Sequence, residues 1–253
     1  MKNSITKSKL EKLALIGFSV VFWFLLWYFA ALIIDNSFFL PSPVETAKAL
    51  IRLLATAEFY KKCALTLLRV FAGLIIGVAL GVIFAVLSNR SRAVYTLISP
   101  IVKVIKATPV ASFIILFWVM FNGDALAVII AVLMVMPIIW QNLIDGYNSI
   151  DKSLYEVSVA YEVGYLKRLK ILVLPSLIKY FIPALLTACG LAWKSEIAAE
   201  IIAYTKNSIG QAINDAKYEF DMPAVFAWSV VIITFSILFE FGLKKLLSGR
   251  FKT

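Results

Sequence analysis

Apolar runs of about twenty residues constrain this sequence more than any other feature. The first run extends from Leu13 to Ile34. At about 1.5 Å per helical residue it is roughly 33 Å long, enough to cross a hydrocarbon core of about 30 Å. A cleaved signal peptide has a shorter apolar core of about 7–15 residues. The run therefore predicts an uncleaved transmembrane helix.

The composition agrees with a membrane location. Hydrophobic residues make up 62% of the chain and charged residues only 16%, against about 45–50% and about 25% in soluble proteins. The formal net charge of +10 is also found in nucleic-acid binders, but a soluble nucleic-acid binder does not carry several long apolar runs. We therefore expect a polytopic protein whose partner is the lipid bilayer, with no nucleic acid.

Residue usage excludes most enzyme chemistry. The two cysteines, Cys63 and Cys189, lie far apart in apolar segments and indicate neither a disulfide framework nor a metal site. The chain has no histidine, which removes Ser-His hydrolysis, HExxH zinc chemistry and histidine proton relays. It also lacks the GxxxxGK[ST] phosphate-binding sequence. We expect no catalytic residue, metal or cofactor, and no ATP hydrolysis by this chain itself.

Hydropathy predicts an all-α fold with six transmembrane helices. The third of these is interrupted by Pro100 and Pro109, so its first turns are expected along the membrane interface. Residues 43–55 show helical amphipathicity and are too charged to span, which favours an interfacial helix. Residues 204–221 are expected to form a polar loop. The six predicted spans are residues 13–34, 64–87, 97–121, 125–144, 177–203 and 222–243.

The Lys and Arg residues predict the orientation. Most of them lie in the two tails, in the loop at residues 88–92, at the start of the third span and between Lys152 and Lys179. Cytoplasmic loops are the Lys/Arg-rich ones. Both termini and the segment Asp151–Pro175 are therefore expected in the cytoplasm.

The second span carries a small residue at every fourth position: Gly73, Gly77, Gly81 and Ala85. Such a strip lets another helix approach closely in lipid. Packing within one subunit and a dimer interface both fit it. In the same span, Arg69 is expected to extend toward the outer interface.

The segment Asp151–Pro175 is the only long polar stretch between two strongly apolar ones. It combines a predicted short helix, residues 155–163, with a turn at Gly164 and a basic cluster. This pattern is typical of a docking element for a soluble partner, although the positive-inside rule alone also accounts for the basic residues. The cluster consists of Lys167, Arg168 and Lys170.

This segment resembles the EAA-x3-G-x9-I-x-LP motif of inner-membrane permease subunits of binding-protein-dependent ABC importers. Glu156 takes the position of the motif's glutamate, and Leu174-Pro175 takes that of its final LP. Val157 and Ser158 replace the alanines, Leu172 replaces the isoleucine, and Glu162 stands at the glycine position with Gly164 displaced by two. The glutamate at a glycine position leaves the geometry of the helix end open.

Four further stretches, residues 40–43, 67–81, 106–118 and 191–202, are similar to permeases of the nitrate, sulfonate and taurine branch. The resemblance covers about residues 40–239. It implies a type I ABC importer permease-like fold, a single transmembrane permease domain over residues 1–253, and a bacterial inner-membrane location. It also implies a homodimer, two copies of an ABC ATPase subunit, and an extracytoplasmic solute-binding protein. The implied activity is ATP-driven, alternating-access import of a small, anionic solute such as a sulfonate, taurine or nitrate.

The resemblance also implies that residues 147–176 form a cytoplasmic coupling segment, whose helix inserts into the ATPase. Apolar side chains on more than one face of that helix suit contact with both the spans and a partner. The expected coupling residues are Glu156, Val157, Ser158, Val159, Tyr161, Glu162, Gly164, Leu174 and Pro175.

The fifth span contains three charges, Lys194, Glu196 and Glu200. A charge at the bilayer centre costs about 2.5–3.5 kcal/mol on insertion scales, so such residues usually face a bundle interior or a wet cavity. The two glutamates share a helical face, and the lysine lies on another. Lys194 either attracts an anionic substrate or pairs with a glutamate of another helix, and Glu200 is expected to reach water near the outer end. With Trp118, these three are the candidate residues of a translocation path.

Other functions and cargoes remain open at this stage. The pyrimidine precursor of thiamine is an alternative cargo. An ATP-independent carrier or channel would need carboxylates deep in several spans or an internal repeat, and neither is visible. The sequence does not choose the cargo or decide between a homodimer and a heterodimer.

Overall fold

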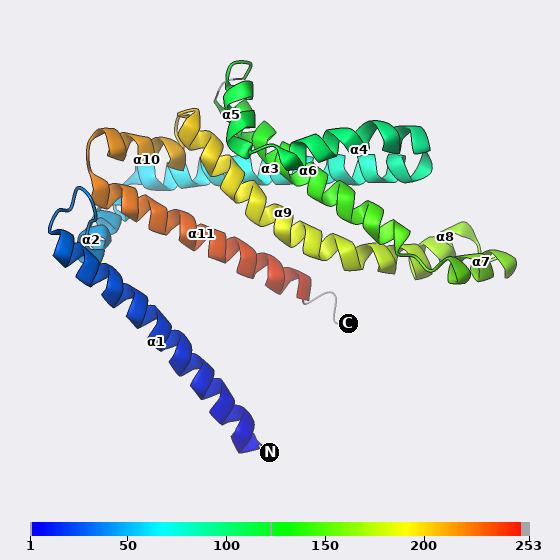
Figure 1. Ribbon diagram of the computed structural model, residues 1–253, viewed down its shortest axis with the longest axis horizontal. Helices are drawn as coiled ribbons and strands as arrows, with labels where there is room; N and C mark the ends of the chain where they lie inside the picture. The colour runs from blue at the N-terminus through cyan, green and yellow to red at the C-terminus, as the bar shows by residue number, and fades with distance from the viewer. Residues whose placement is uncertain (1, 122, 249–253) are drawn as a thin grey trace. The chain divides into compact units, whose positions relative to one another are not determined.

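The computed structural model describes residues 2–121 and 123–248, and the regular elements in this part of the chain are all helical (Figure 1). Short connections join successive helices. The elements are α1 (Lys2–Ile34), α2 (Pro43–Leu54), α3 (Ala57–Arg90), α4 (Arg92–Ala107), α5 (Val110–Trp118), α6 (Asp124–Asn148), α7 (Lys152–Ala160), α8 (Tyr165–Arg168), the π-helical turn η1 (Leu169–Val173), α9 (Leu174–Ile202), α10 (Ile209–Tyr218) and α11 (Met222–Ser248).

Among the described residues, five helical segments are long and apolar enough to cross a membrane: α1, α3, α6, α8 to α9, and α11. The pair α4 and α5 adds a sixth if it is one broken span, because the two helices meet at an angle of 103°. The third span expected over residues 97–121 is thus divided between α4 and α5 at Pro109, one of the two prolines expected to interrupt it. Thr108 has an extended ψ of 133°, as expected for a residue that precedes a proline.

The expected polar loop at residues 204–221 is wrong, because this segment contains helix α10. The Ser208 hydroxyl accepts the backbone N–H of Gln211 at 2.9 Å and so caps the helix start. Ile209, Ala212 and Ala216 are buried. A short buried stripe at helical spacing stabilises α10 although its overall composition is polar.

The chain divides into two compact units, residues 1–60 with 213–231, and residues 61–212 with 232–253. In the first unit, the Trp27 indole N–H donates to the Pro41 carbonyl at 3.0 Å, and its ring stacks on Phe226. Helix α2 starts with a capping box formed by Ser42 and Glu45. A hydrogen bond from the Ser37 hydroxyl, followed by those from Ser42, lowers the pKa of the Glu45 carboxyl.

In the second unit, the glycine strip of α3 packs against α6. A Cβ added at Gly77 would lie 2.7 Å from the Cβ of Val135, and Gly73 and Gly81 meet Ala131 and Ile139 in the same way. Real Cβ atoms do not approach so closely, so the two backbones can adopt this distance only with glycine here. The strip therefore serves packing within the chain, which is one of the two roles that its sequence allows.

Helix α6 contributes to two apolar clusters of the second unit. One cluster joins it to α3 and α4, and there the Trp140 indole N–H donates to the Ser88 hydroxyl at 3.0 Å. The other cluster joins it to α5 and α9. This core holds α3, α6 and α9 as one framework, from which α7 and α8 extend at the end of the α6–α9 pair (Figure 1). The second cluster consists of Ile114, Leu126, Ala127, Ile130, Ala199 and Ala203.

Candidate functional site

Helix α7 is fixed at its start by a side-chain cap. The Asp151 carboxylate accepts the backbone N–H groups of Ser153 at 2.8 Å and Leu154 at 3.3 Å. These are donors at the start of the helix that would otherwise lack a partner. The position of α7 relative to the end of α6 is therefore set locally.

The other end of α7 is closed by a left-handed residue. Glu162 has a φ of +53°, its N–H donates to the Val159 carbonyl at 2.9 Å, and the Val163 N–H donates to the Ser158 carbonyl at 3.0 Å. This is the Schellman pattern, which usually places glycine at the left-handed position. Glu162 thus adopts a left-handed conformation that glycine usually occupies, at a cost of about 1–2 kcal/mol.

Arg168 ties α8 back onto α7. Its guanidinium donates to the Val163 carbonyl at 2.9 Å and lies 5.1 Å from the centre of the Tyr155 ring. The cation–π contact and the hydrogen bond hold the turn between the two helices. This basic residue therefore has a structural task besides any effect on topology. The turn η1 then continues α8 into α9 without a break.

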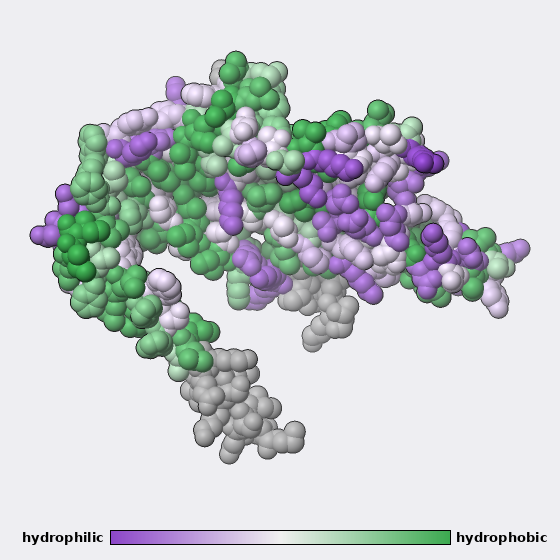
Figure 2. Space-filling model, in the orientation of Figure 1, coloured by the Kyte–Doolittle hydropathy of each residue, from purple (hydrophilic) through white to green (hydrophobic). Residues whose placement is uncertain are grey.

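The α7–α8 segment exposes many apolar side chains beside polar ones (Figure 2). Tyr161 is 80% exposed and Leu166 is 77% exposed. Of the expected coupling residues, those from Glu156 to Gly164 lie together on α7 and its turn, and all are exposed except Ser158, which is partly buried. Leu174 and Pro175 are exposed at the start of α9, separated from the others by α8 and η1. The apolar side chains exposed on α7, α8 and their turn are Leu154, Tyr155, Val157, Val159, Tyr161, Tyr165 and Leu166.

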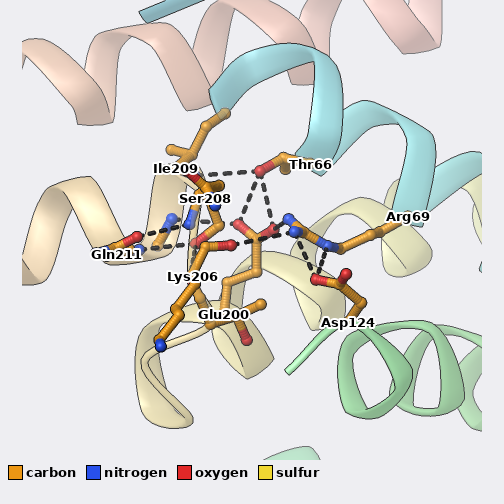
Figure 3. Close-up of polar contacts among 11 residues, drawn as sticks. Thr66, Arg69, Asp124, Glu200, Lys206, Ser208, Ile209 and Gln211 are labelled. Atoms are coloured by element: carbon orange, nitrogen blue, oxygen red, sulfur yellow. Dashed lines mark hydrogen bonds and ion pairs between the residues drawn. The ribbon is translucent and has the colours of Figure 1, made fainter. Parts of the chain in front are cut away.

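A second group of polar residues surrounds the Glu200 carboxylate (Figure 3). Glu200 is fully buried. It accepts hydrogen bonds from the Thr66 hydroxyl at 2.8 Å, the Arg69 guanidinium at 2.8 Å and the Gly210 backbone N–H at 3.2 Å. A Cβ on Gly210 would lie 2.4 Å from the Cβ of Glu200. Only glycine therefore allows the start of α10 to approach this carboxylate.

Arg69 connects Glu200 to two further elements. Its guanidinium lies 2.6 Å from the Asp124 carboxylate and donates to the Lys206 carbonyl at 3.2 Å (Figure 3). The Arg69 side chain is only 5% exposed. The expectation that Arg69 extends to the interface is thus wrong, as is the expectation that Glu200 reaches water. A buried charge is stable only when it is paired and hydrogen-bonded, and these two residues satisfy each other.

Glu196 lies one helical turn before Glu200 and is also fully buried. Neither of its carboxyl oxygens has a hydrogen-bond partner within the part of the chain that the structure describes. Its charged neighbours are Glu200 and Arg69. The shared face of the two glutamates is therefore the packed face of α9.

Lys194 is on the other side of α9 and is exposed. It lines a cavity of about 390 Å³ between α9 and α11, together with Glu240. Trp118 is the last residue of α5 and 47% exposed, and it does not line this cavity. The structure thus separates the expected path residues into a buried pair, Glu196 and Glu200, a lysine that lines the cavity, and a tryptophan that does not.

Sequence reasoning missed Thr66, Asp124 and Gly210 as parts of the Glu200 network. A charge inside a span, Arg69, was the available signal that a buried partner exists. The partner's identity was hidden, since 131 positions separate Arg69 from Glu200. Among the described residues, no group of three or more His, Cys, Asp or Glu side chains could hold a metal ion.

Comparisons with known proteins place these features in a family context. Residues 77–252 match the family model of the binding-protein-dependent transport system inner membrane component. The taurine transport system permease protein TauC of Escherichia coli is 22% identical over 226 residues, covering 87% of this chain and 82% of the relative. The formylaminopyrimidine transport permease protein ThiX of Halalkalibacterium halodurans is 25% identical over 224 residues, covering 87% of this chain and 88% of the relative.

The fold has a counterpart among solved structures. The crystal structure of an amino acid ABC transporter with histidines superposes with a TM-score of 0.63 at 18% sequence identity. The match covers 79% of this chain and 95% of that chain. The all-helical architecture is therefore that of type I ABC importer permeases.

Proposed function

This chain belongs to the binding-protein-dependent transport system inner membrane component family, and we propose that it imports a small solute with an anionic group by ATP-driven alternating access. As a multi-pass inner-membrane transport subunit it is the permease, and a partner subunit supplies ATP hydrolysis. The proposed assembly contains two copies of this chain, two copies of an ABC ATPase and an extracytoplasmic solute-binding protein. In this arrangement both termini and the α7–α8 segment are cytoplasmic.

The exposed α7–α8 segment is the observation that carries this proposal. Its helix is capped at Asp151, closed at Glu162 and held by Arg168, so its shape does not depend on a partner. Yet it presents Tyr161 and Leu166 to solvent. A rigid surface element with exposed aromatic and aliphatic side chains has the composition of an interface centre. We assign the ATPase as the partner that covers it.

The route from this surface into the membrane is short. Helix α8, η1 and α9 follow one another without a break, so a displacement of α7 and α8 by the ATPases would move α9. Lys194 lies on α9 and faces a cavity. We propose that Lys194 attracts the anionic group of the solute along the path, with Trp118 lining it elsewhere.

We propose a structural role for Glu196 and Glu200, without contact to the solute. Neither side chain is exposed in this conformation, so we propose that they support the wall of the path from behind α9. Glu200 does so by holding α3 and the start of α10 against α9 through Thr66 and Gly210.

Copurification of the permease with its ATPase tests the docking surface. Leu166→Gln, and charge reversal by Glu156→Lys with Glu162→Lys, should each reduce the ATPase recovered with detergent-extracted permease at least tenfold, measured by native mass spectrometry. Val119→Gln is the matched control, because Val119 is 88% exposed but lies beyond α5. Undiminished ATPase recovery with the α7 and α8 variants would refute the assignment.

A pyrimidine precursor is a second candidate cargo, favoured by the similarity to ThiX. Competition experiments in proteoliposomes that contain the complete transporter distinguish the anionic cargo from the pyrimidine cargo. If the anionic cargo is correct, excess taurine inhibits uptake of the native solute and formylaminopyrimidine does not. The reverse pattern supports the alternative.

A further inference from the structure

The cavity between α9 and α11 contains charges of both signs. Lys194 of α9 and Glu240 of α11 both line it, and they are near enough for their charges to interact. A cavity of about 390 Å³ falls within the range of small-molecule sites, about 300–1,000 Å³. Charged side chains within a span usually face such a wet cavity.

Lys194 is not paired directly with an acidic side chain in the part of the chain whose side chains the structure describes. Among residues 14–121 and 123–245, no hydrogen bond or ion pair to the Lys194 ammonium is found, whereas Glu240 pairs with Lys244 of its own helix. The α9–α11 cavity is therefore not closed by a direct Lys194–Glu240 pair. An ammonium group without a carboxylate partner is available to an anionic ligand.

Hydrogen-bonding groups surround these charges. The Trp193 ring is 1% exposed and lines the cavity, and its indole N–H is buried without a hydrogen-bond acceptor in the described part of the chain. A buried donor without a partner costs about 1–3 kcal/mol. The hydroxyls of Thr187 and Ser236 line the same cavity.

The rest of the wall is apolar. Leu186, Leu191 and Phe239 line it, and the Trp193 ring packs against Phe239 with 5.6 Å between ring centres. The cavity thus offers a cation, an anion, hydroxyl oxygens and a short apolar surface, although the Thr187 hydroxyl already donates to the Pro183 carbonyl at 3.0 Å. These features match a ligand with an anionic group, a short carbon chain and an ammonium group.

We propose that the α9–α11 cavity binds a small zwitterion, whose anionic group pairs with Lys194 and whose ammonium group pairs with Glu240. The identification of this zwitterion as cargo rests on the proposed import function. The headgroup of phosphatidylethanolamine has the same chemistry, so a lipid is the other possible source.

Binding to the purified permease–ATPase complex tests this inference. The complex is placed in nanodiscs of phosphatidylglycerol, and equilibrium dialysis measures taurine, ethanesulfonate, which lacks the ammonium group, and ethylamine, which lacks the anion. We expect taurine to bind at least tenfold more tightly than either of the other two. Lys194→Gln should abolish taurine binding, and Glu240→Gln should remove the preference for taurine over ethanesulfonate.

Two control variants separate recognition from general damage. Lys179→Gln removes an exposed lysine of the same helix outside the cavity and should leave binding unchanged. Lys244→Gln breaks the pair with Glu240 while keeping the carboxylate, and it should preserve the preference for taurine. If Lys244→Gln and Glu240→Gln have the same effect, the carboxylate does not recognise the ligand and the inference is overturned.

The source of the zwitterion follows from a second arm, in which phosphatidylethanolamine is added to the nanodiscs. Retention of this lipid that is lost in Lys194→Gln and Glu240→Gln, with no taurine binding, supports the zwitterion site with lipid as its occupant. Equal binding of taurine and ethanesulfonate, or no binding of taurine and lipid, overturns it. Recovery of the ATPase with the permease is scored separately, so failure of the import function is distinguishable.

Discussion

The close packing of α3 on α6 leads to a quantitative prediction for Gly77→Ala. The new Cβ would lie 2.7 Å from the Cβ and 2.8 Å from the Cγ1 of Val135, about 1 Å inside the favourable carbon separation of about 3.5–4.0 Å. Overpacking of this kind costs about 1–3 kcal/mol. The higher helix propensity of alanine offsets about 0.5–1 kcal/mol of this loss in unfolding free energy. We therefore expect a net loss of about 1–2 kcal/mol of unfolding free energy.

The assay is unfolding of the detergent-solubilised protein by added sodium dodecyl sulfate, followed by tryptophan fluorescence. Gly242→Ala is the matched control, because Gly242 is also helical but has no atom within 4 Å of an added Cβ. It should be unchanged or more stable by up to about 1 kcal/mol.

Two results would refute the reasoning. If Gly77→Ala and Gly242→Ala had equal stability, α6 could not occupy the glycine strip. If Gly77→Ala left the unfolding free energy unchanged but separated an oligomer into monomers, the strip would belong to an interface between copies. That second result would restore the alternative that the sequence left open.

Three further changes have defined outcomes. Arg69→Met leaves the carboxylates of Glu200 and Asp124 without their cation and should cost about 3–5 kcal/mol in the same unfolding assay. Glu162→Gly relieves the left-handed conformation and should slow amide hydrogen exchange at the end of α7 about fivefold, equivalent to about 1 kcal/mol. The lowered pKa of Glu45 means that its contribution to stability is complete above its unfolded value of about 4.3 and is lost as pH falls through the folded value. Thermal stability of Glu45→Gln should therefore approach that of the wild type at acid pH and fall below it at neutral pH.

Local features of the sequence were sufficient for much of the architecture. A membrane span depends on the length and apolarity of a continuous segment, so five of the six expected spans correspond to single helices in the structure. The polar segment before Leu174-Pro175 indicated a docking element and the permease family for the same reason, since the motif is contiguous in the chain. The spacing of Glu196 and Glu200 also placed them on one face of their helix.

At two positions the sequence indicated a local feature, but only the structure showed how the backbone runs there. Pro109 lies in the predicted third span, and its effect on the preceding residue turns the chain by 103° between α4 and α5. Glu162 stands at a glycine position of the motif, so the sequence did not decide how α7 ends. A non-glycine residue adopts the left-handed region only where surrounding contacts compensate its cost. Glu162 adopts the left-handed region here, and the two hydrogen bonds of the Schellman turn accompany it.

Apolarity and spacing by themselves determined that this chain is a helical membrane protein with one long polar segment between two apolar ones. Tertiary structure alone decided that Glu200 is buried against Thr66 and Arg69, that α6 covers the glycine strip, and that Lys194 faces a cavity with Glu240. The reason is physical. Burial of a helix in lipid depends on its own residues, whereas the stability of a charge within it depends on partners that lie more than a hundred residues away.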